Sequence, residues 1–245
     1  MFGFLYLPLA LLMLFSFSRS VSGTFPITGF SLHWYRTLYE DFFVLDAFRN
    51  SLVVAAVTTV VATSVGTLGA FGLVRCQFRL KGVLTSLIIL PMVMPGLLVG
   101  VALLILLVPI LRLTLSLWTA ALGHIVTVTP FTVLVVATRL YGFDRSLEFA
   151  AADLGATPLR VLWHVTLPLM MPGILAAALI AFTLSLDEFI VTLFTIGSAS
   201  TLPMYVWSQV RMGVTPTINA LGTILIALSM IILLVAQVAL RRRSA

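Results

Sequence analysis

The sequence predicts an all-α integral membrane protein with about six transmembrane helices. Of its 245 residues, 61% are hydrophobic and only 9% are charged, whereas soluble domains carry about 25% charged residues. The mean hydropathy is +1.18, and the apolar residues form long runs, as a bilayer crossing of about 20 residues requires. Length alone would allow one or two soluble domains, but this composition overrides that expectation.

Six apolar segments can cross the bilayer, and we treat residues 1–245 as a single transmembrane domain. The segments are residues 2–17, 51–74, 83–107, 117–140, 172–195 and 219–240. The first is slightly short and starts at Met1, so a cleaved signal peptide is the alternative; the basic n-region of such a peptide is missing. We expect a retained helix, with a start codon upstream of Met1 left open. Residues 19–50 form a mixed segment whose aromatics, Trp34, Tyr35 and Tyr39, fit an interfacial anchor.

Glycine and proline residues predict close packing and distortions within these spans. In the second span, Gly66, Gly69 and Gly72 recur every three residues and allow a neighbouring helix to approach closely. The third span contains Pro91 and Pro95, which remove backbone donors and should bend or open the helix. Gly96 and Gly100 add a small-residue face to it, and Pro130 interrupts the fourth span.

The segment 146–172 is the longest part of the second half that a bilayer would not accept. Its sequence predicts two short helices with a forced break between them. Ser146 can cap the first helix, and residues 147–154 are mostly good helix formers. Gly155 can end that helix in the left-handed conformation, and Thr157-Pro158 supplies a cap and a first helical residue for the second.

The same segment resembles the cytoplasmic EAA loop of ABC-importer permeases. The loop pattern is Glu-Ala-Ala, three residues, Gly, nine residues, Ile-x-Leu-Pro. Here Ala150-Ala151, Gly155 and Val165-Thr166-Leu167-Pro168 keep that spacing throughout. The glutamate of the triplet is replaced by Phe149, and Glu148 comes one residue earlier. The flanking residues are similar to the spermidine/putrescine subgroup, which often carries Leu-Glu-Glu-Ala-Ala. The alternative, a loop with an incidental amphipathic turn, does not explain the spacing.

This resemblance implies a type I ABC-importer permease fold, in which a cytoplasmic coupling helix within residues 143–168 receives the motion of separate ATPase subunits. The residues that it assigns to ATPase coupling are Glu148, Ala150, Ala151, Asp153, Leu154, Gly155, Ala156, Leu167 and Pro168. It also implies a second permease subunit, identical or different, and a periplasmic substrate-binding protein. The chain itself needs no cofactor, because ATP is bound by the partner subunit.

Asp187 and Glu188 are the acidic residues inside the predicted spans. An ionised carboxylate in hydrocarbon costs about 2.5–3.5 kcal/mol on insertion scales, so such groups face a cavity, a partner or a substrate. They form either a cation-attracting patch on the translocation path or a helix-end pair at the interface, with Arg211 as one available partner. Adjacent helical residues point about 100° apart, so only one of the two can face a pore.

A second resemblance lies around this acidic pair. Leu184-Ser185-Leu186-Asp187-Glu188-Phe189, with Thr201-Leu202-Pro203 and residues 213–221, is similar to spermidine/putrescine permeases. There the motif commonly reads Ser-Leu/Met-Asp-Asp, so Glu188 preserves the charge. The resemblance implies an importer for polyamines or a similar small cation. Relatives of this subgroup also serve ferric iron and other solutes, so ferric iron stays open as the alternative.

Basic residues predict the orientation of the chain. One set of alternate loops holds nine of them: Arg75, Arg79, Lys81, Arg139, Arg145, Arg160, Arg241, Arg242 and Arg243. The opposite loops hold five: Arg19, Arg36, Arg49, Arg112 and Arg211. This bias predicts a multi-pass protein with both termini and the loop at residues 143–168 in the cytoplasm, and the resemblance to ABC-importer permeases implies the bacterial inner membrane.

Several other classes of protein fit the sequence less well. The only lysine, Lys81, is not part of a GxxxxGK[ST] phosphate loop, and no His-Glu-x-x-His or nucleophile-elbow pattern occurs, so we expect no enzyme activity in this chain. Cys76 is the only cysteine, and the three histidines are dispersed, so we expect no metal site. The net charge of +6 comes from residues at the ends of apolar runs rather than from a nucleic-acid-binding patch. An ion-coupled secondary transporter stays open as the less favoured alternative, since it should show inverted repeats and none is visible.

Overall fold

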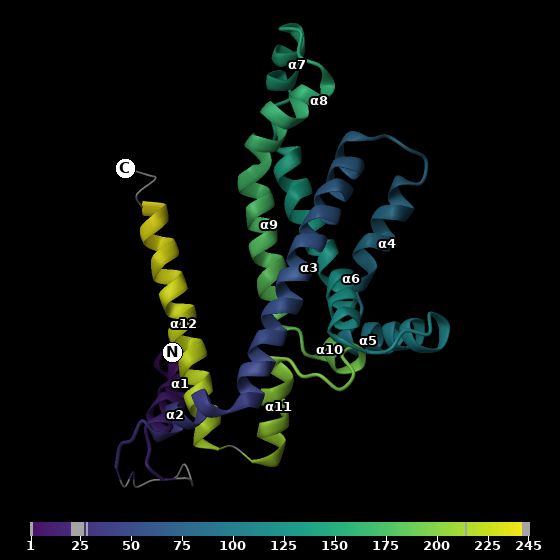
Figure 1. Ribbon diagram of the computed structural model, residues 1–245. Helices are drawn as coiled ribbons and strands as arrows, with labels where there is room; N and C mark the ends of the chain where they lie inside the picture. Colours follow the sequence, from purple (N-terminus) through teal and green to yellow (C-terminus); the bar gives the residue numbers. More distant parts are fainter. Residues whose placement is uncertain (1, 21–26, 28, 214, 242–245) are drawn as a thin grey trace. The chain divides into compact units, whose positions relative to one another are not determined.

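The computed structural model describes residues 2–20, 27, 29–213 and 215–241, and the chain in these ranges forms helices without β-strands (Figure 1). The helices are, in chain order, α1 (Phe2–Ser16), α2 (His33–Glu40), α3 (Phe42–Arg75), α4 (Lys81–Val93), α5 (Gly96–Ile105), η1 (Leu106–Ile110), α6 (Leu117–Tyr141), α7 (Ser146–Asp153), α8 (Pro158–Val161), η2 (Leu162–Thr166), α9 (Leu167–Asp187), α10 (Ile190–Thr195), α11 (Leu202–Met212) and α12 (Pro216–Arg241). The segments η1 and η2 are π-helical.

The chain forms two compact units, and the larger comprises residues 48–204. In this unit α6 packs against α9, while α10 packs against both α5 and α6. Figure 1 shows α7 and α8 at one end of this unit, with α5 and α10 toward the other end. The buried apolar cluster between α3, α6 and α9 comprises Ala70, Leu73, Val133, Val136, Leu140, Met170 and Ala177.

Close packing of α3 on α6 depends on a glycine. The Thr132 hydroxyl donates a hydrogen bond of 2.9 Å to the carbonyl of Ala62, which brings the two helix backbones together. A Cβ at Gly66 would lie 1.9 Å from Thr132 Oγ1, and one at Gly69 would lie 3.4 Å from Val133. The close approach predicted for these two glycines is confirmed, whereas Gly72 has no neighbouring atom within 4 Å of its ideal Cβ position.

The smaller unit comprises residues 1–47 and 205–245. In it α12 packs against α1 and α2. The aromatic residues of the predicted interfacial segment link α2 to the end of α1: Trp34 Nε1 donates to the Ser18 carbonyl at 2.7 Å, and the Tyr35 hydroxyl lies 2.7 Å from Ser16 Oγ. Tyr39 is exposed on α2.

Three helical stretches in the described part of the chain are long and apolar enough to cross a membrane by themselves, namely Phe42–Arg75, Leu117–Tyr141 and Pro158–Asp187. A fourth crossing is possible if the bent pair Lys81–Val93 and Gly96–Ile110 forms one span. Tyr6–Ser16 and Pro216–Ala227 are shorter apolar helices. The all-helical, multi-span architecture expected from composition is therefore present.

The third predicted span, residues 83–107, is broken rather than merely bent. Its two halves meet at 108°. The break is at Pro95, because α4 continues through Pro91 and ends at Val93, and Met94 is extended with ψ 142°. The residue before a proline is pushed out of the helical region by the pyrrolidine ring, which explains why Met94 ends α4. The distortion predicted for this span is thus confirmed and located.

Three other boundaries differ from the sequence-based expectation. Pro130 does not interrupt the fourth span, because α6 runs through it without a break. The second span begins at Phe42 rather than near residue 51, because the Asp41 carboxylate accepts the Phe43 N–H at 2.9 Å and starts the helix early. The fifth predicted span, residues 172–195, is not one helix: a helical stretch runs from Pro158 to Asp187, and α10 (Ile190–Thr195) follows after a break at residues 188–189.

Candidate functional site

The connection between α6 and α9 is a helical hairpin with a defined reversal at Gly155. Gly155 has φ +84°, its N–H donates to the Ala152 carbonyl at 2.9 Å, and the Ala156 N–H donates to the Ala151 carbonyl at 3.1 Å. These two bonds are those of a Schellman motif, which satisfies the last carbonyls of a helix and requires a left-handed residue. The helix stop predicted at Gly155 is confirmed.

The two helix starts of the hairpin use one expected cap and one that sequence reasoning missed. Thr157 caps α8, with its hydroxyl accepting the Arg160 N–H at 3.5 Å. Ser146, expected as the cap of α7, is instead the first helical residue, and Asp144 Oδ1 accepts its N–H at 2.9 Å. This backbone hydrogen bond, followed by one from the Ser146 side chain, lowers the pKa of Asp144.

Glu148 faces inward and ties α7 to two other elements. Its Oε1 accepts hydrogen bonds from Arg75 Nη2 at 2.9 Å and from Thr166 Oγ1 at 2.7 Å. Both side chains of the ion pair are mostly covered, with exposed fractions of 17% for Arg75 and 18% for Glu148. The Arg75 guanidinium also lies 5.5 Å from the centre of the Phe143 ring. Glu148 therefore fixes the position of α7 on the end of α3 and on η2.

The outward surface of the hairpin is apolar. Leu154 is 90% exposed, and further large apolar side chains are exposed beside it. These side chains, which we call the hairpin surface, are Leu147, Phe149, Leu154, Leu159 and Trp163. Phe149 stands where the loop pattern has a glutamate, so this position presents an aromatic ring rather than a charge. Of the predicted coupling residues, Ala150, Asp153, Leu154, Gly155 and Pro168 are exposed, and Ala151, Ala156 and Leu167 are partly covered.

The second helix of the hairpin continues into the membrane-spanning segment. Residues Pro158–Asp187 form one helical stretch of 30 residues, with a π-helical segment at Leu162–Thr166 that ends two residues before Pro168. A proline inside a helix removes one donor and its ring needs room near the carbonyl four residues earlier, and a π-turn is a common way to accommodate such a misfit. The second helix of the hairpin and the distant end of α9 are thus parts of one continuous helix.

Asp187 and Glu188 lie where this helix ends. Asp187 is the last residue of α9 and is exposed. Glu188 is extended, with ψ 113°, and α10 begins two residues later. Glu188 Oε1 accepts the Val191 N–H at 2.9 Å, and its carbonyl accepts the Thr192 hydroxyl at 2.7 Å. The Glu188 carboxylate therefore caps α10, whereas Asp187 makes no hydrogen bond or ion pair within the described ranges.

A buried histidine of α6 bridges this break. His124 is 1% exposed, and its two ring nitrogens lie 2.7 Å from Ser185 Oγ on α9 and 2.7 Å from Thr192 Oγ1 on α10. One ring nitrogen of a neutral imidazole donates and the other accepts, so both hydroxyls can be satisfied at once. His124 holds the two helix ends on either side of the acidic pair at a fixed separation.

Sequence reasoning missed the partners of these site residues. Arg75 is 73 positions from Glu148, and His124 is 61 positions from Ser185; no local pattern links residues so far apart. The exposure of Trp163 had a weak signal, since an aromatic residue between charged residues in a non-spanning segment is unusual. Within the described ranges no group of three or more His, Cys, Asp or Glu residues could hold a metal ion.

Comparison with known proteins gives a family match and close relatives. The family model described as "Binding-protein-dependent transport system inner membrane component" matches residues 62–244. The chain is similar to the putrescine transport system permease protein PotI of Escherichia coli (strain K12), with 42% identity over 92% of this chain and 82% of that protein. It is 35% identical to the spermidine/putrescine transport system permease protein PotC of the same organism, over 99% of this chain and 92% of that protein.

Solved structures share the fold at low sequence identity. A bacterial ABC transporter involved in the import of the acidic polysaccharide alginate matches with a TM-score of 0.75 and 18% identity, covering 98% of this chain and 90% of that chain. The MetNI methionine ABC transporter, in inward-facing conformations, matches with a TM-score of 0.64 and 20% identity, covering 88% of this chain and 99% of that chain.

Proposed function

Because the chain belongs to the family of binding-protein-dependent transport system inner membrane components, we propose that it forms the transmembrane pathway of an ATP-driven importer for a polyamine, with putrescine and spermidine as the leading solutes. The two relatives at 42% and 35% identity carry these solutes in their names. The chain is a multi-pass inner-membrane transport subunit with the fold of ABC-importer permeases.

The single observation that carries a coupling mechanism is the unbroken helix from Pro158 to Asp187. It joins the hairpin surface at one end to the acidic break at the other. At a rise of about 1.5 Å per residue, the 21 residues of α9 span about 30 Å, which is the thickness of the hydrocarbon core. We propose that ATPase subunits push on the hairpin surface and that this helix carries the displacement to Asp187 and Glu188.

The same proposal includes the partner subunits of this chain and its orientation in the membrane. The importer contains two ATPase subunits, a second permease subunit and a periplasmic binding protein, while both termini and the hairpin face the cytoplasm. The basic residues of the loops support this orientation. The coupling residues are those that the loop pattern assigns, Glu148, Ala150, Ala151, Asp153, Leu154, Gly155, Ala156, Leu167 and Pro168. Within them, Glu148 positions α7, and the exposed residues make the contact.

A cationic solute is favoured by the acidic break. Asp187 presents a carboxylate at a helix end inside an apolar segment, where a cation stabilises the ionised form. An anionic solute would meet a repulsive charge there. A probable molybdenum ABC transporter permease of Haloferax volcanii is also a relative, at 37% identity over 67% of this chain. The experiment must therefore distinguish putrescine uptake from two alternatives, uptake of an oxyanion such as molybdate and uptake of ferric iron.

The test uses the complete importer in proteoliposomes and one substitution on the hairpin surface. We expect Leu154→Glu to weaken retention of the ATPase subunits roughly 30-fold, the effect of about 2 kcal/mol at an exposed anchor residue, and to abolish ATP-driven uptake of radiolabelled putrescine. Leu80→Glu is the matched control, because Leu80 is 66% exposed but lies in the neighbouring loop between α3 and α4. Equal ATPase retention by the two variants would contradict coupling through the hairpin, and uptake of molybdate or ferric iron instead of putrescine would contradict the solute.

A further inference from the structure

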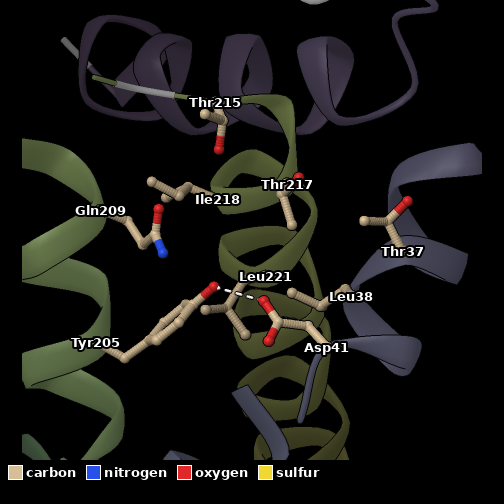
Figure 2. Close-up of a pocket in the computed structure, with 9 residues that line it drawn as sticks. All are labelled: Thr37, Leu38, Asp41, Tyr205, Gln209, Thr215, Thr217, Ile218 and Leu221. Carbon is tan, nitrogen blue, oxygen red and sulfur yellow. Dashed lines mark hydrogen bonds between the residues drawn. The ribbon is translucent and has the colours of Figure 1, made fainter. Parts of the chain in front are cut away.

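The smaller unit contains a polar cavity where α2, α11 and α12 meet (Figure 2). Its volume is about 200 Å³, below the roughly 300–1,000 Å³ of pockets for drug-sized ligands, so it fits one small head group. The residues that line it are Thr37, Leu38, Asp41, Tyr205, Gln209, Thr215, Thr217, Ile218 and Leu221. Nothing in the proposed transport mechanism uses this cavity.

The cavity contains one negative charge that is not neutralised. Asp41 forms no ion pair in the part of the chain that the structure describes, and the nearby Arg36 is paired with Glu40 at 3.0 Å. One oxygen of Asp41 accepts the Phe43 N–H at 2.9 Å, and the other accepts the Tyr205 hydroxyl at 2.9 Å. A carboxylate offers about four acceptor positions, so about two of them remain free for a ligand.

The other polar groups of the cavity extend this acceptor set. Burial, followed by the hydrogen bond from the phenol to Asp41 and the negative charge of that carboxylate, raises the pKa of Tyr205 to about 12. The phenol therefore stays protonated at neutral pH and donates to Asp41, while a hydrogen bond from the Gln209 side chain to the phenol oxygen opposes the rise in pKa. Figure 2 shows Tyr205 and Gln209 on one side of the cavity, Thr217 on α12 and Asp41 opposite. No lining residue is cationic.

We propose that this cavity, which we call the Asp41 pocket, binds the primary ammonium group of a small aliphatic amine. An ammonium group has three N–H donors and no acceptor, which matches a lining of carboxylate, hydroxyl and amide oxygens. Leu38, Ile218 and Leu221 lie beside these groups and provide contact for the methylene carbons, from which an inorganic cation would gain nothing. The pocket accordingly selects an organic cation over Na⁺.

Two sources can supply such a group, namely a free diamine or the head group of phosphatidylethanolamine. Exposed aromatic side chains next to the pocket, Tyr39, Phe42 and Phe43, are typical of the membrane interface, where both are accessible. In the proposed orientation Asp41 lies on the outer side, because it precedes the second span. This inference goes beyond the proposed function, since binding here requires neither ATP nor transport.

The experiment measures equilibrium binding of 1,4-diaminobutane to the membrane-embedded importer in phosphatidylcholine nanodiscs, without its periplasmic binding protein and without nucleotide. All proteins carry Asp187→Asn, so that binding at the acidic break does not contribute. We expect Asp41→Asn to weaken binding about 10-fold or more, as loss of a charge-assisted hydrogen bond predicts. Glu40→Gln is the matched control, because it removes the same charge one residue away, outside the pocket. Thr217→Val, which keeps Asp41, should weaken binding several-fold.

The remaining arms identify the ligand. Tetramethylammonium has the same charge as an ammonium group but no N–H donor, and it should bind at least 10-fold more weakly than 1,4-diaminobutane. If 1,4-diaminobutane binds more weakly in phosphatidylethanolamine nanodiscs than in phosphatidylcholine nanodiscs, the lipid head group competes for the pocket and is its ligand. If its binding is undiminished there, the free amine is the ligand. Equal binding by the Asp41→Asn and Glu40→Gln proteins, or equal affinity for tetramethylammonium, overturns the proposal. Failure of putrescine uptake would not affect this result, because the measurement involves no transport.

Discussion

Asp187 and Glu188 are neighbours in the chain, but their carboxylates have different surroundings. Glu188 accepts a backbone N–H and caps α10, whereas Asp187 is exposed at the end of α9. A cap contributes about 1 kcal/mol to local stability through its oxygen rather than its charge. The Asp187 carboxylate caps no helix in the described part of the chain and is therefore available to bind a cation. The two residues therefore call for different tests.

We expect Asp187→Asn to reduce putrescine uptake about 10-fold or more, because it removes the charge that would contact the cation and leaves the shape unchanged. Glu188→Gln should retain most uptake, since the Gln side-chain oxygen can still accept the Val191 N–H. Initial rates in proteoliposomes containing the complete importer measure both effects. Unchanged flux in the Asp187→Asn protein would remove this residue from the path.

For His124 the sequence predicts the type of interaction but not its partners. A buried histidine needs hydrogen-bond partners for its ring nitrogens, and the structure gives His124 two hydroxyl partners in a buried position. The chemical type of the interaction was thus predictable from imidazole chemistry. Its location at the break between α9 and α10 was not, because Ser185 and Thr192 become its neighbours only through the packing of α6 on those helices.

At the scale of secondary-structure elements, local sequence rules predicted where a helix ends better than whether a helix continues through a proline. The end of α7 at Gly155 and the start of α8 at Thr157 follow from backbone conformations that only certain residues favour. By contrast, Pro130 and Pro168 both lie inside continuous helices. Apolar segments retain their helical backbone bonds around a proline because no water is available to replace them. The second helix of the hairpin, α8, and α9 therefore form a single element, which the sequence alone divides into two.

Gly155→Ala should destabilise the end of α7 by about 1–2 kcal/mol, the cost of a left-handed conformation with a Cβ. No atom lies within 4 Å of the position of that Cβ, so the whole effect comes from the backbone. Hydrogen exchange at Gly155 or its replacement and at Ala156 should accelerate roughly 5- to 30-fold. Gly155→Asn should show a smaller acceleration, because Asn tolerates this conformation.

Gly82→Ala is the matched control for this measurement. Gly82 also has nothing within 4 Å of its ideal Cβ position, but its φ is not in the left-handed region, so alanine there should leave hydrogen exchange in the hairpin unchanged. If Gly155→Ala and Gly82→Ala give the same exchange rates, the positive φ at Gly155 does not determine the end of α7.

For the molecule as a whole, composition predicted the fold class and the family resemblance predicted the role. Both predictions use properties that can be read from the linear sequence, namely hydropathy and the spacing of motif residues. The functional contacts of the described residues were not predictable in this way, since the Glu148–Arg75 ion pair and the Asp41–Tyr205 hydrogen bond join residues 73 and 164 positions apart. Such pairs arise from helix packing, which a hydropathy pattern does not encode.

The orientation of the whole chain can be tested with its only cysteine. Cys76 is exposed in the connection between α3 and α4, beside the basic residues Arg75 and Arg79. A membrane-impermeant maleimide should label it in inside-out vesicles and not in intact spheroplasts, as expected for a cytoplasmic loop. A Cys76→Ser protein provides the background. Labelling in intact spheroplasts would reverse the proposed topology.

The Arg75–Glu148 ion pair makes Cys76 useful in another way. Its N–H still bonds to the Gly72 carbonyl at 3.1 Å, so it remains attached to the last turn of α3, next to the arginine that holds Glu148 at 2.9 Å. A nitroxide attached to this native thiol would report on the end of α3, which the Arg75–Glu148 ion pair connects to α7. Electron paramagnetic resonance spectra taken with and without nucleotide would then measure the motion of this region without an engineered cysteine.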